Sequence, residues 1–290
     1  MLLKPVAPAS EASAIEKILE EIKGLISLPE IYQRLRTLID DPKSDIDQFV
    51  EVVSSDPNLT VAVLKVANSA FFGFPGKIGS LNQAVSMLGI GQLHDLVLAT
   101  SAIGSLQLPN EIVPLKAFWR FSLFSAVLTR LLARHLKIPQ GERLFVIGLL
   151  HEIGHLVIYA KLPELAKRAL ESARSGQRQL HLVEEQLLGM HYGEIGAKLM
   201  AQWQLPGHFQ DIVHYQPTPD HAETYHKETA LLHLVHRCAE RAVFARAGLT
   251  QTGDETATAL QDLGLTAEQL EEAIERTREV CREMEKVMLN

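Results

Sequence analysis

The chain has 290 residues, 47% of them hydrophobic and 22% charged, and this composition excludes a largely disordered protein. Its 28 Lys and Arg against 35 Asp and Glu give a formal net charge of −7, which disfavours nucleic acid as the principal ligand. Cys238 and Cys281 form no C-x-x-C motif, so no disulfide is expected. Residues 1–23 contain no secretory apolar core, and the longest apolar stretch, residues 144–160, is short for a membrane span and contains Glu152. We therefore expect a cytoplasmic protein with no membrane partner.

Apolar residues recur at the helical period along almost the whole chain, and no hairpin signal is found, which predicts an all-α fold. Residues 1–24 are predicted to form an amphipathic helix. Residues 25–110 are predicted to form an N-terminal lobe of short helices. Three helix starts in this lobe are marked by capping residues: Ser44 with Asp47, Asp56 before Pro57, and Ser80 with Gln83.

The second half of the chain is predicted to form a larger helical lobe over residues 111–246, packed against the first. It contains a long helix at 118–136 and a buried, continuous helix at 142–160. Residues 247–290 are predicted to be a polar linker and a C-terminal amphipathic helix at 267–289. The apolar side of that helix predicts docking either on its own chain or on a partner, including a second copy that would make a homo-oligomer.

The sharpest local signal is the sequence His151-Glu152-Ile-Gly154-His155, which has two interpretations. As an H-E-x-x-H motif, His151 and His155 would bind zinc while Glu152 acts as the general base of a peptidase. As a variant of a His-Asp doublet, His151 and Glu152 would both bind metal, and Gly154 would allow close helix packing. Zinc peptidases usually hold their substrate against a sheet edge, which disfavours the first interpretation. Without a metal, His151 and Glu152 would be a buried polar pair that satisfies itself and nearby backbone.

Motifs around the doublet resemble a known family. They are Leu28-Pro29-Glu30, Ser55-Asp56-Pro57, Val66-Ala67-Asn68-Ser69-Ala70, Ile78-Gly79-Ser80-Leu81, His191-Tyr-Gly-Glu, Trp203-Gln-Leu-Pro206 and His214-Tyr-Gln-Pro217. In this order and spacing the sequence resembles the HDOD family, a branch of the HD superfamily of metal-dependent phosphohydrolases, from about Leu28 to Ala245. The resemblance implies an all-α bacterial signalling protein with an HD-like second lobe, in a family whose metal centre is often degraded.

The resemblance also implies which residues would form the metal centre. His151, Glu152, His191 and His214 match family positions, whereas Phe121 falls where the first histidine ligand belongs and His236 falls where the late aspartate belongs. The candidate metal ligands are therefore His151, Glu152, His191, His214 and His236, for iron, manganese or zinc. Phenylalanine cannot ligate a metal, so we expect a weakened or vestigial site.

Two functions of different classes remain open, with the zinc peptidase as a remote third. The leading hypothesis is a non-catalytic signalling or scaffold protein that binds other signalling proteins and requires no cofactor. The alternative is a metal-dependent phosphohydrolase of nucleotides or cyclic dinucleotides that uses the rebuilt ligand set. The net charge of −7 favours the binding protein, because it does not attract polyanionic substrates.

Overall fold

The computed structural model describes residues 30–68, 76–94, 97–98, 112–139, 141–244 and 256–288. Within these ranges the chain has 14 α-helices, two 3-10 helices and no β-strand, which confirms the all-α prediction. The predicted helix at 1–24, the proposed lobe boundary near residue 110 and the linker at 248–254 lie outside the described residues.

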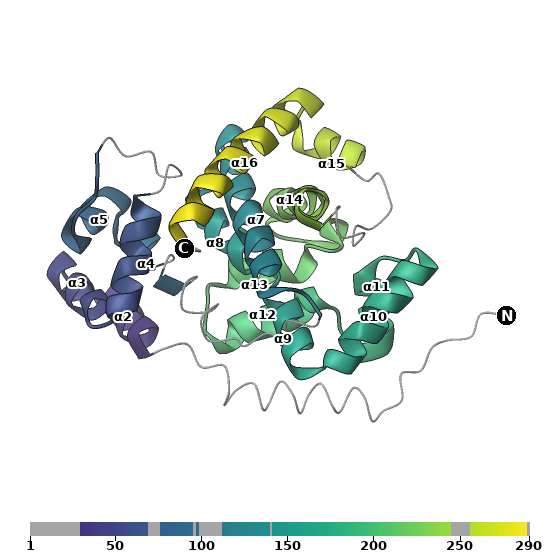
Figure 1. The fold of residues 1–290 in the computed structure, drawn as a ribbon, viewed down its shortest axis with the longest axis horizontal. Helices are drawn as coiled ribbons and strands as arrows, with labels where there is room; N and C mark the ends of the chain where they lie inside the picture. The colour runs from purple at the N-terminus through teal and green to yellow at the C-terminus, as the bar shows by residue number, and fades with distance from the viewer. Residues whose placement is uncertain are drawn as a thin grey trace.

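The N-terminal lobe lies at the left of Figure 1 and consists of α2 (Glu30–Asp40), α3 (Ile46–Ser54), α4 (Pro57–Ala67) and α5 (Leu81–Leu88). The capping residues explain where its helices begin. Oδ1 of Asp56 accepts a hydrogen bond from the amide of Leu59 at 3.1 Å, as expected for α4. The capping box of α3 is formed by Asp45 and Gln48, one residue later than predicted, because Oδ1 of Asp45 accepts from the Gln48 amide at 2.9 Å.

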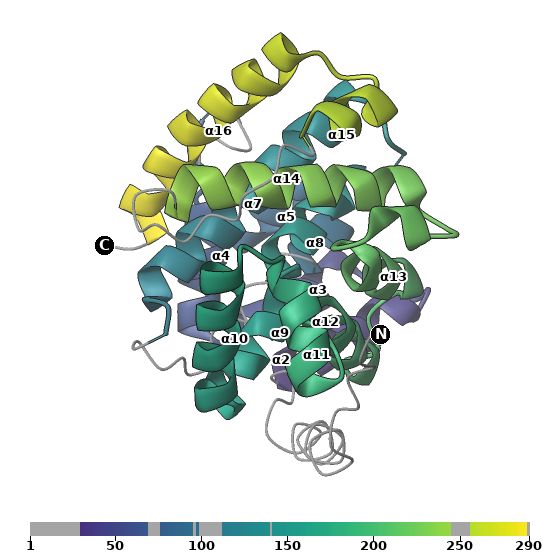
Figure 2. The same ribbon diagram turned by 90° about the vertical axis from the view of Figure 1, so that its right-hand side faces the viewer.

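The larger lobe is built around the long helix α7. Its elements are α7 (Leu115–His135), η1 (Gly141–Arg143), α8 (Leu144–Leu150), α9 (Ile153–Lys161), α10 (Pro163–Gly176), α11 (Leu180–Leu188), α12 (Tyr192–Gln202), α13 (Gly207–Tyr215), η2 (Pro219–His221) and α14 (His226–Phe244). Helices α8 and α14 pack on α7, while α9 packs on α12 and α12 on α13. Figure 2 shows α14 running across this group, with α10 and α11 forming a pair at its edge.

The predicted continuous helix at 142–160 is wrong in one important respect. The segment consists of a 3-10 turn, α8 and α9, and the two helices are separated by His151 and Glu152, which lie in a turn. The α-helical pattern resumes where the Leu156 amide donates to the carbonyl of Glu152 at 3.2 Å. The segment Leu144–Lys161 is apolar and long enough to cross a membrane by composition alone, but 89% of it is buried inside the protein. It is therefore a core segment of the lobe.

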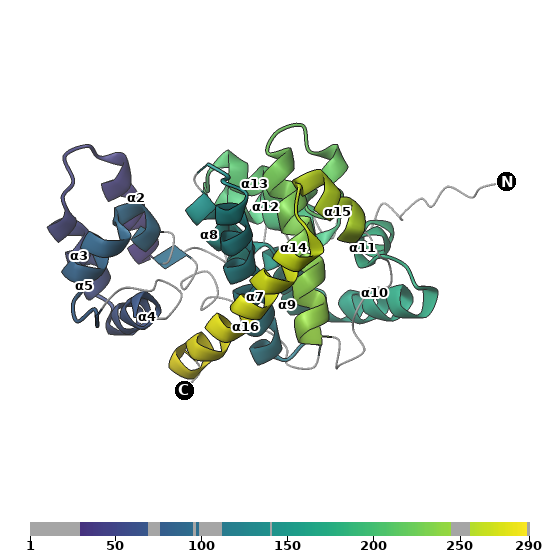
Figure 3. The same cartoon turned by 90° about the horizontal axis from the view of Figure 1, so that it is seen from above.

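The C-terminal segment contains α15 (Thr256–Leu263), which the sequence analysis did not predict, and α16 (Ala267–Met288), which it did. Helix α16 packs on α7 of the larger lobe and on α4 of the N-terminal lobe, and Figure 3 shows it extending from the side of α14 toward α4. Its apolar face is buried at Leu270, Val280, Cys281 and Met284. Docking on its own chain is thus observed, while a homo-oligomer through this helix stays a prediction.

One hydrophobic cluster runs through both lobes, from Tyr32 on α2 to Met284 on α16. A polar contact also joins α2 to the larger lobe, because Nη1 of Arg36 donates to Oε1 of Gln204 at 2.9 Å and to the carbonyl of Trp203 at 3.4 Å. The predicted bundle of two packed helical lobes is therefore confirmed.

Candidate metal centre

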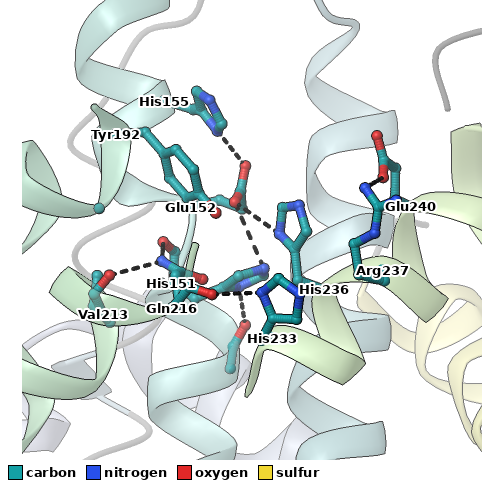
Figure 4. Close-up of polar contacts among 12 residues, drawn as sticks. His151, Glu152, His155, Tyr192, Val213, Gln216, His233, His236, Arg237 and Glu240 are labelled. Carbon is teal, nitrogen blue, oxygen red and sulfur yellow. Dashed lines mark hydrogen bonds and ion pairs between the residues drawn. The ribbon is translucent and has the colours of Figure 1, made fainter. Parts of the chain in front are cut away.

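The turn between α8 and α9 brings two side-chain donors together with one from α14. Nε2 of His151, Oε1 of Glu152 and Nδ1 of His236 all lie within 4.8 Å of one another (Figure 4). Oε1 of Glu152 is 3.7 Å from Nε2 of His151 and 3.2 Å from Nδ1 of His236. These three atoms, called the donor triad below, are buried, and none has a hydrogen-bond partner outside the triad. Buried polar atoms without partners are costly, so their convergence is typical of a site that a cation completes.

His151 is held in the form that binds metals. Its Nδ1 lies 2.6 Å from the carbonyl of Gly148, which can only accept, so Nδ1 donates and Nε2 keeps its lone pair for the triad. Burial lowers the pKa of His151 to about 4, which keeps the ring neutral. The carbonyl of His151 accepts from Nε2 of Gln216 at 2.8 Å, and His233 contacts the Gln216 carbonyl through Nδ1 at 2.7 Å. The ring and its backbone are therefore both fixed.

The second oxygen of Glu152 is committed to His155. Oε2 of Glu152 lies 2.5 Å from Nδ1 of His155, and Nε2 of His155 lies 2.9 Å from Oε1 of Glu184 on α11. Burial alone would lower the pKa of His155, but the two carboxylates outweigh it and raise that pKa to about 10. His155 is therefore an imidazolium, and its ring stacks on Tyr192 with 4.1 Å between ring centroids.

This arrangement decides between the two interpretations of the motif. Both nitrogens of His155 are occupied by carboxylates, so His155 cannot share a zinc ion with His151. The zinc-peptidase interpretation is therefore wrong. The close helix packing predicted for Gly154 is observed, because a Cβ atom there would lie 1.9 Å from the carbonyl oxygen of Tyr192 on α12.

The structure does not bring all five predicted ligands together. His191 is the N-cap of α12, and its Nδ1 accepts hydrogen bonds from the amides of Gly193 at 3.1 Å and Glu194 at 3.4 Å. Its ring lies 6.0 Å from that of His214 between centroids, in a group of its own. Among the described residues, the donor triad is the one group of three donors close enough to share an ion. In the structure His191 and His214 therefore lie apart from the donor triad, and α12 uses His191 as a cap.

Phe121 faces the donor triad from α7. Its ring centroid lies 5.4 Å from that of His151 and 5.5 Å from that of His236. The resemblance placed Phe121 and His236 at the candidate metal centre, and in the structure Phe121 packs beside the donor triad that His236 helps to form. Phe121 therefore fills space beside the triad without offering a donor atom.

Sequence reasoning missed the residue that holds His155. The adjacent pair Glu184-Glu185 is typical of a solvated helix face, but only 1% of Glu184 is exposed. Its Oε2 also accepts from the amide of Tyr192 at 3.0 Å, so it links α11 to the start of α12. The signal was its position four residues after Leu180 and next to Val183, on the apolar stripe of α11.

Comparison with known families gives one match over most of the chain. The sequence model of the HDOD domain matches residues 25–219. Among curated proteins, an uncharacterized protein of Treponema pallidum (strain Nichols) is 24% identical over 214 residues. That alignment covers 72% of this chain but 41% of the relative, so the chain spans less than half of the relative's length.

Several solved structures share the fold. The crystal structure of a Shewanella amazonensis SB2B protein named "Putative phosphohydrolase" is 27% identical, covers 93% of this chain and 97% of its own, and has a TM-score of 0.75. A Marinobacter aquaeolei VT8 protein named "Putative signal transduction protein" is 25% identical, with 99% and 66% covered and a TM-score of 0.71. An HDOD domain protein of unknown function from Geobacter sulfurreducens is 19% identical, with 97% and 99% covered and a TM-score of 0.72.

The family match ends at residue 219, before α14 begins. His151 and Glu152 of the donor triad therefore lie inside the matched region, while His236 is contributed by a helix beyond it.

Proposed function

The chain belongs to the HDOD family, and from this premise we propose that it is a non-catalytic bacterial signalling protein, active in the cytoplasm, that works by binding other signalling proteins. The observation that carries the proposal is the composition of the site. Phe121, which offers no ligand atom, packs against both histidines of the donor triad, and His191 and His214 lie apart from it.

The chemistry of phosphoester hydrolysis explains why this composition matters. Dinuclear hydrolases hold two ions about 3.5–4 Å apart to activate water and stabilise the leaving oxygen. In the described part of the chain, only three donors converge, which is enough for one ion and leaves no set for a second. Phe118, Phe121 and Phe244 line the adjoining cavity, and none of its described lining residues is a lysine or arginine. The imidazolium of His155 also lines it, but carboxylates occupy both of its nitrogens, so the wall offers a phosphate no free cationic partner.

The donor triad nevertheless fits a single divalent ion. Two imidazole nitrogens and one carboxylate oxygen are a donor set used for iron, manganese or zinc. His151, Glu152 and His236 would hold such an ion, which when bound would act as a Lewis acid toward water. The imidazolium of His155 would keep Oε2 of Glu152 occupied, so that Oε1 alone faces the ion.

A metal-dependent phosphohydrolase is the second candidate, and two observations favour it. The three atoms of the donor triad are buried without hydrogen-bond partners outside the triad, and the Shewanella protein that is 27% identical carries a phosphohydrolase name. In this alternative the ion at the triad would act alone on nucleotides or cyclic dinucleotides.

Metal analysis and turnover assays on the same preparation separate the two candidates. Purified protein is incubated with Mn²⁺, Fe²⁺ or Zn²⁺, washed, analysed for metal and assayed with nucleotides and cyclic dinucleotides. We expect at most one ion per chain and no turnover above that of the His151→Ala variant. Metal-dependent turnover that is lost in His151→Ala but kept in His221→Ala, which changes an exposed histidine, would overturn the proposal.

A further inference from the structure

A second cavity, of about 280 Å³, lies between α8, α13 and the start of α14, and it shares no lining residue with the cavity beside the donor triad. None of the described residues that line it belongs to the triad. Leu144 and Ile147 of α8 and Ile212 of α13 form its floor, and all three are buried in the core. The other lining residues are mostly polar and are exposed or partly exposed, so the second cavity has an apolar floor beneath a polar rim.

The rim carries one charge of each sign. Arg143, the last residue of η1, is exposed, and Glu228, in the first turn of α14, is partly exposed. Among the described residues, no hydrogen bond or ion pair engages the guanidinium of Arg143 or the carboxylate of Glu228, and the two groups do not pair with each other. A cation and an anion that line one cavity without pairing complement a ligand that carries both charges.

Tyr225 and His208 give the rim an aromatic side. The ring of Tyr225 lies 5.8 Å from that of His208 between centroids, and 43% of Tyr225 is exposed. Its backbone has a φ of 55°, in the left-handed region that a non-glycine residue rarely adopts, and its carbonyl accepts from the amide and the hydroxyl of Thr229 at 2.9 and 2.8 Å. The fold therefore holds an aromatic ring at the second cavity in an unfavourable backbone conformation, which is typical of residues that contact a ligand.

We propose that the second cavity binds a free α-amino acid with an apolar side chain. The carboxylate of the ligand binds Arg143, its ammonium group binds Glu228, and its side chain packs against Tyr225 and the apolar floor. The proposal goes beyond the non-catalytic signalling role, because it gives the protein a small-molecule ligand at a separate site. It does not depend on whether the donor triad holds an ion.

The lining disfavours ligands that lack one of these parts. A phosphate or a simple carboxylic acid would bring a second negative charge to Glu228, and a simple amine would bring a second positive charge to Arg143. An uncharged apolar ligand would cover both charged groups and offer neither of them a partner. The size also fits, because about 280 Å³ equals the share of roughly nine water molecules in the liquid, which is enough for an amino acid of the size of leucine.

Calorimetric titration of the full chain tests this proposal. The probes are L-leucine and L-phenylalanine, and three further compounds each lack one part of the ligand. N-acetyl-L-leucine lacks the ammonium group, L-leucinamide lacks the carboxylate, and glycine lacks the apolar side chain. We expect both probes to bind and each of the three other compounds to bind at least about tenfold more weakly than L-leucine.

Two variants and two controls locate the site. Arg143→Gln removes the positive charge of the rim and Glu228→Gln removes the negative charge, and each should weaken binding of L-leucine about tenfold or more. Arg134→Gln and Glu223→Gln remove the same charges from exposed residues that do not line the second cavity, and both should bind L-leucine as the natural protein does. Thermal unfolding of each variant without ligand checks that it is folded.

Three results would overturn the inference: no binding of L-leucine or L-phenylalanine, equal binding of L-leucine and any of the three compounds that lack a part, or unchanged binding of L-leucine in Arg143→Gln or Glu228→Gln. Failure of the proposed function is seen separately, as metal-dependent turnover. A chain that binds L-leucine without turnover supports both conclusions.

Discussion

Phe121 lies against both histidines of the donor triad, with ring centroids 5.4 Å from His151 and 5.5 Å from His236. At the scale of single residues, this phenylalanine and the cap formed by His191 are what separate the site from a fuller metal centre. Both residues stabilise the protein, Phe121 by packing and His191 by satisfying amides at the start of α12.

Replacing Phe121 by histidine should strengthen metal binding. The new imidazole would supply a fourth donor beside the triad, and we expect Mn²⁺ or Zn²⁺ affinity to rise at least about tenfold. Calorimetric titration measures the affinity, and thermal unfolding with and without metal shows whether stability becomes metal-dependent. Phe124→His on the same helix is the control, because Phe124 is equally buried but does not line the cavity. Equal affinity in the two variants would contradict the prediction.

His191 should make stability depend on pH. Burial, followed by the neighbouring His181 and His214, lowers its pKa in the folded state to about 4 from the ordinary value of 6.5. The unfolded chain then binds a proton at a higher pH than the folded chain does, so stability is complete above 6.5 and falls as the pH is lowered toward about 4. Protonation of Nδ1 would also remove the acceptor that caps α12.

The His191→Asn variant tests this pH dependence. Asparagine caps helices well, so we expect it to keep most of the stability at neutral pH. Urea unfolding across the range from about pH 4 to 6.5 should show a smaller slope of free energy against pH than in the natural protein. Burial also lowers the pKa of His151, which would produce a pH dependence of the same sign. An unchanged slope in His191→Asn would therefore mean that His191 does not contribute.

At the scale of elements, the interrupted helix α8–α9 builds the site. The turn at His151 and Glu152 directs both side chains toward α14, while α9 continues to pack on α12. Glu184 links α11 to α9 and α12, because its carboxylate contacts His155 on α9 and accepts a hydrogen bond from the amide of Tyr192 at the start of α12.

The contact between α9 and α12 depends on Gly154. A methyl group there would lie 1.9 Å from the carbonyl oxygen of Tyr192 and 2.9 Å from the amide of Gly196, and backbone cannot move aside cheaply. We expect Gly154→Ala to lower the free energy of unfolding by about 3 kcal/mol. Urea denaturation measures this loss. Gly207→Ala is the matched control, because nothing lies within 4 Å of its added Cβ and a loss above about 1 kcal/mol is not expected.

At the scale of the whole molecule, α14 and α16 complete the matched domain. The family match ends at residue 219, yet α14 contributes His236 to the donor triad and α16 packs on helices of both lobes. The segment beyond the match therefore takes part both in the candidate site and in the contact between the lobes.

Met284 should be a main anchor of α16. Only 1% of it is exposed, and truncation to alanine leaves a cavity, so we expect Met284→Ala to cost about 2–5 kcal/mol of unfolding free energy. Glu283→Ala changes the exposed neighbour and should stay within about 0.5 kcal/mol. Thermal and urea unfolding measure both variants. A comparable small effect in both would show that α16 is only loosely docked.

The docking of α16 on its own chain also affects the mass of the protein in solution. Because α16 buries its apolar face on its own chain, deletion of 267–290 should expose α7 and α4 and raise the tendency to associate. Light scattering after size-exclusion chromatography distinguishes this from an oligomer that α16 itself holds together, which would instead become smaller on deletion.

The sequence by itself determined the features that depend on residues within about one helical turn. Helical periodicity predicted the all-α class, capping residues marked the starts of α4 and α5, and the motif order identified the family. The resemblance also placed Phe121 and His236 at the same site as His151, although they are far apart in the chain.

Only the tertiary structure decided how the donors are shared. How α9, α11, α12 and α14 pack decides three things about these side chains. Glu152 contacts both His155 and His236, Glu184 is buried, and His191 caps α12 instead of lying at the triad. Such contacts join residues up to 84 positions apart, as Glu152 and His236 are, so no local pattern contains them. Helix packing sets those distances, and so it determined that three of the five predicted ligands meet and two do not.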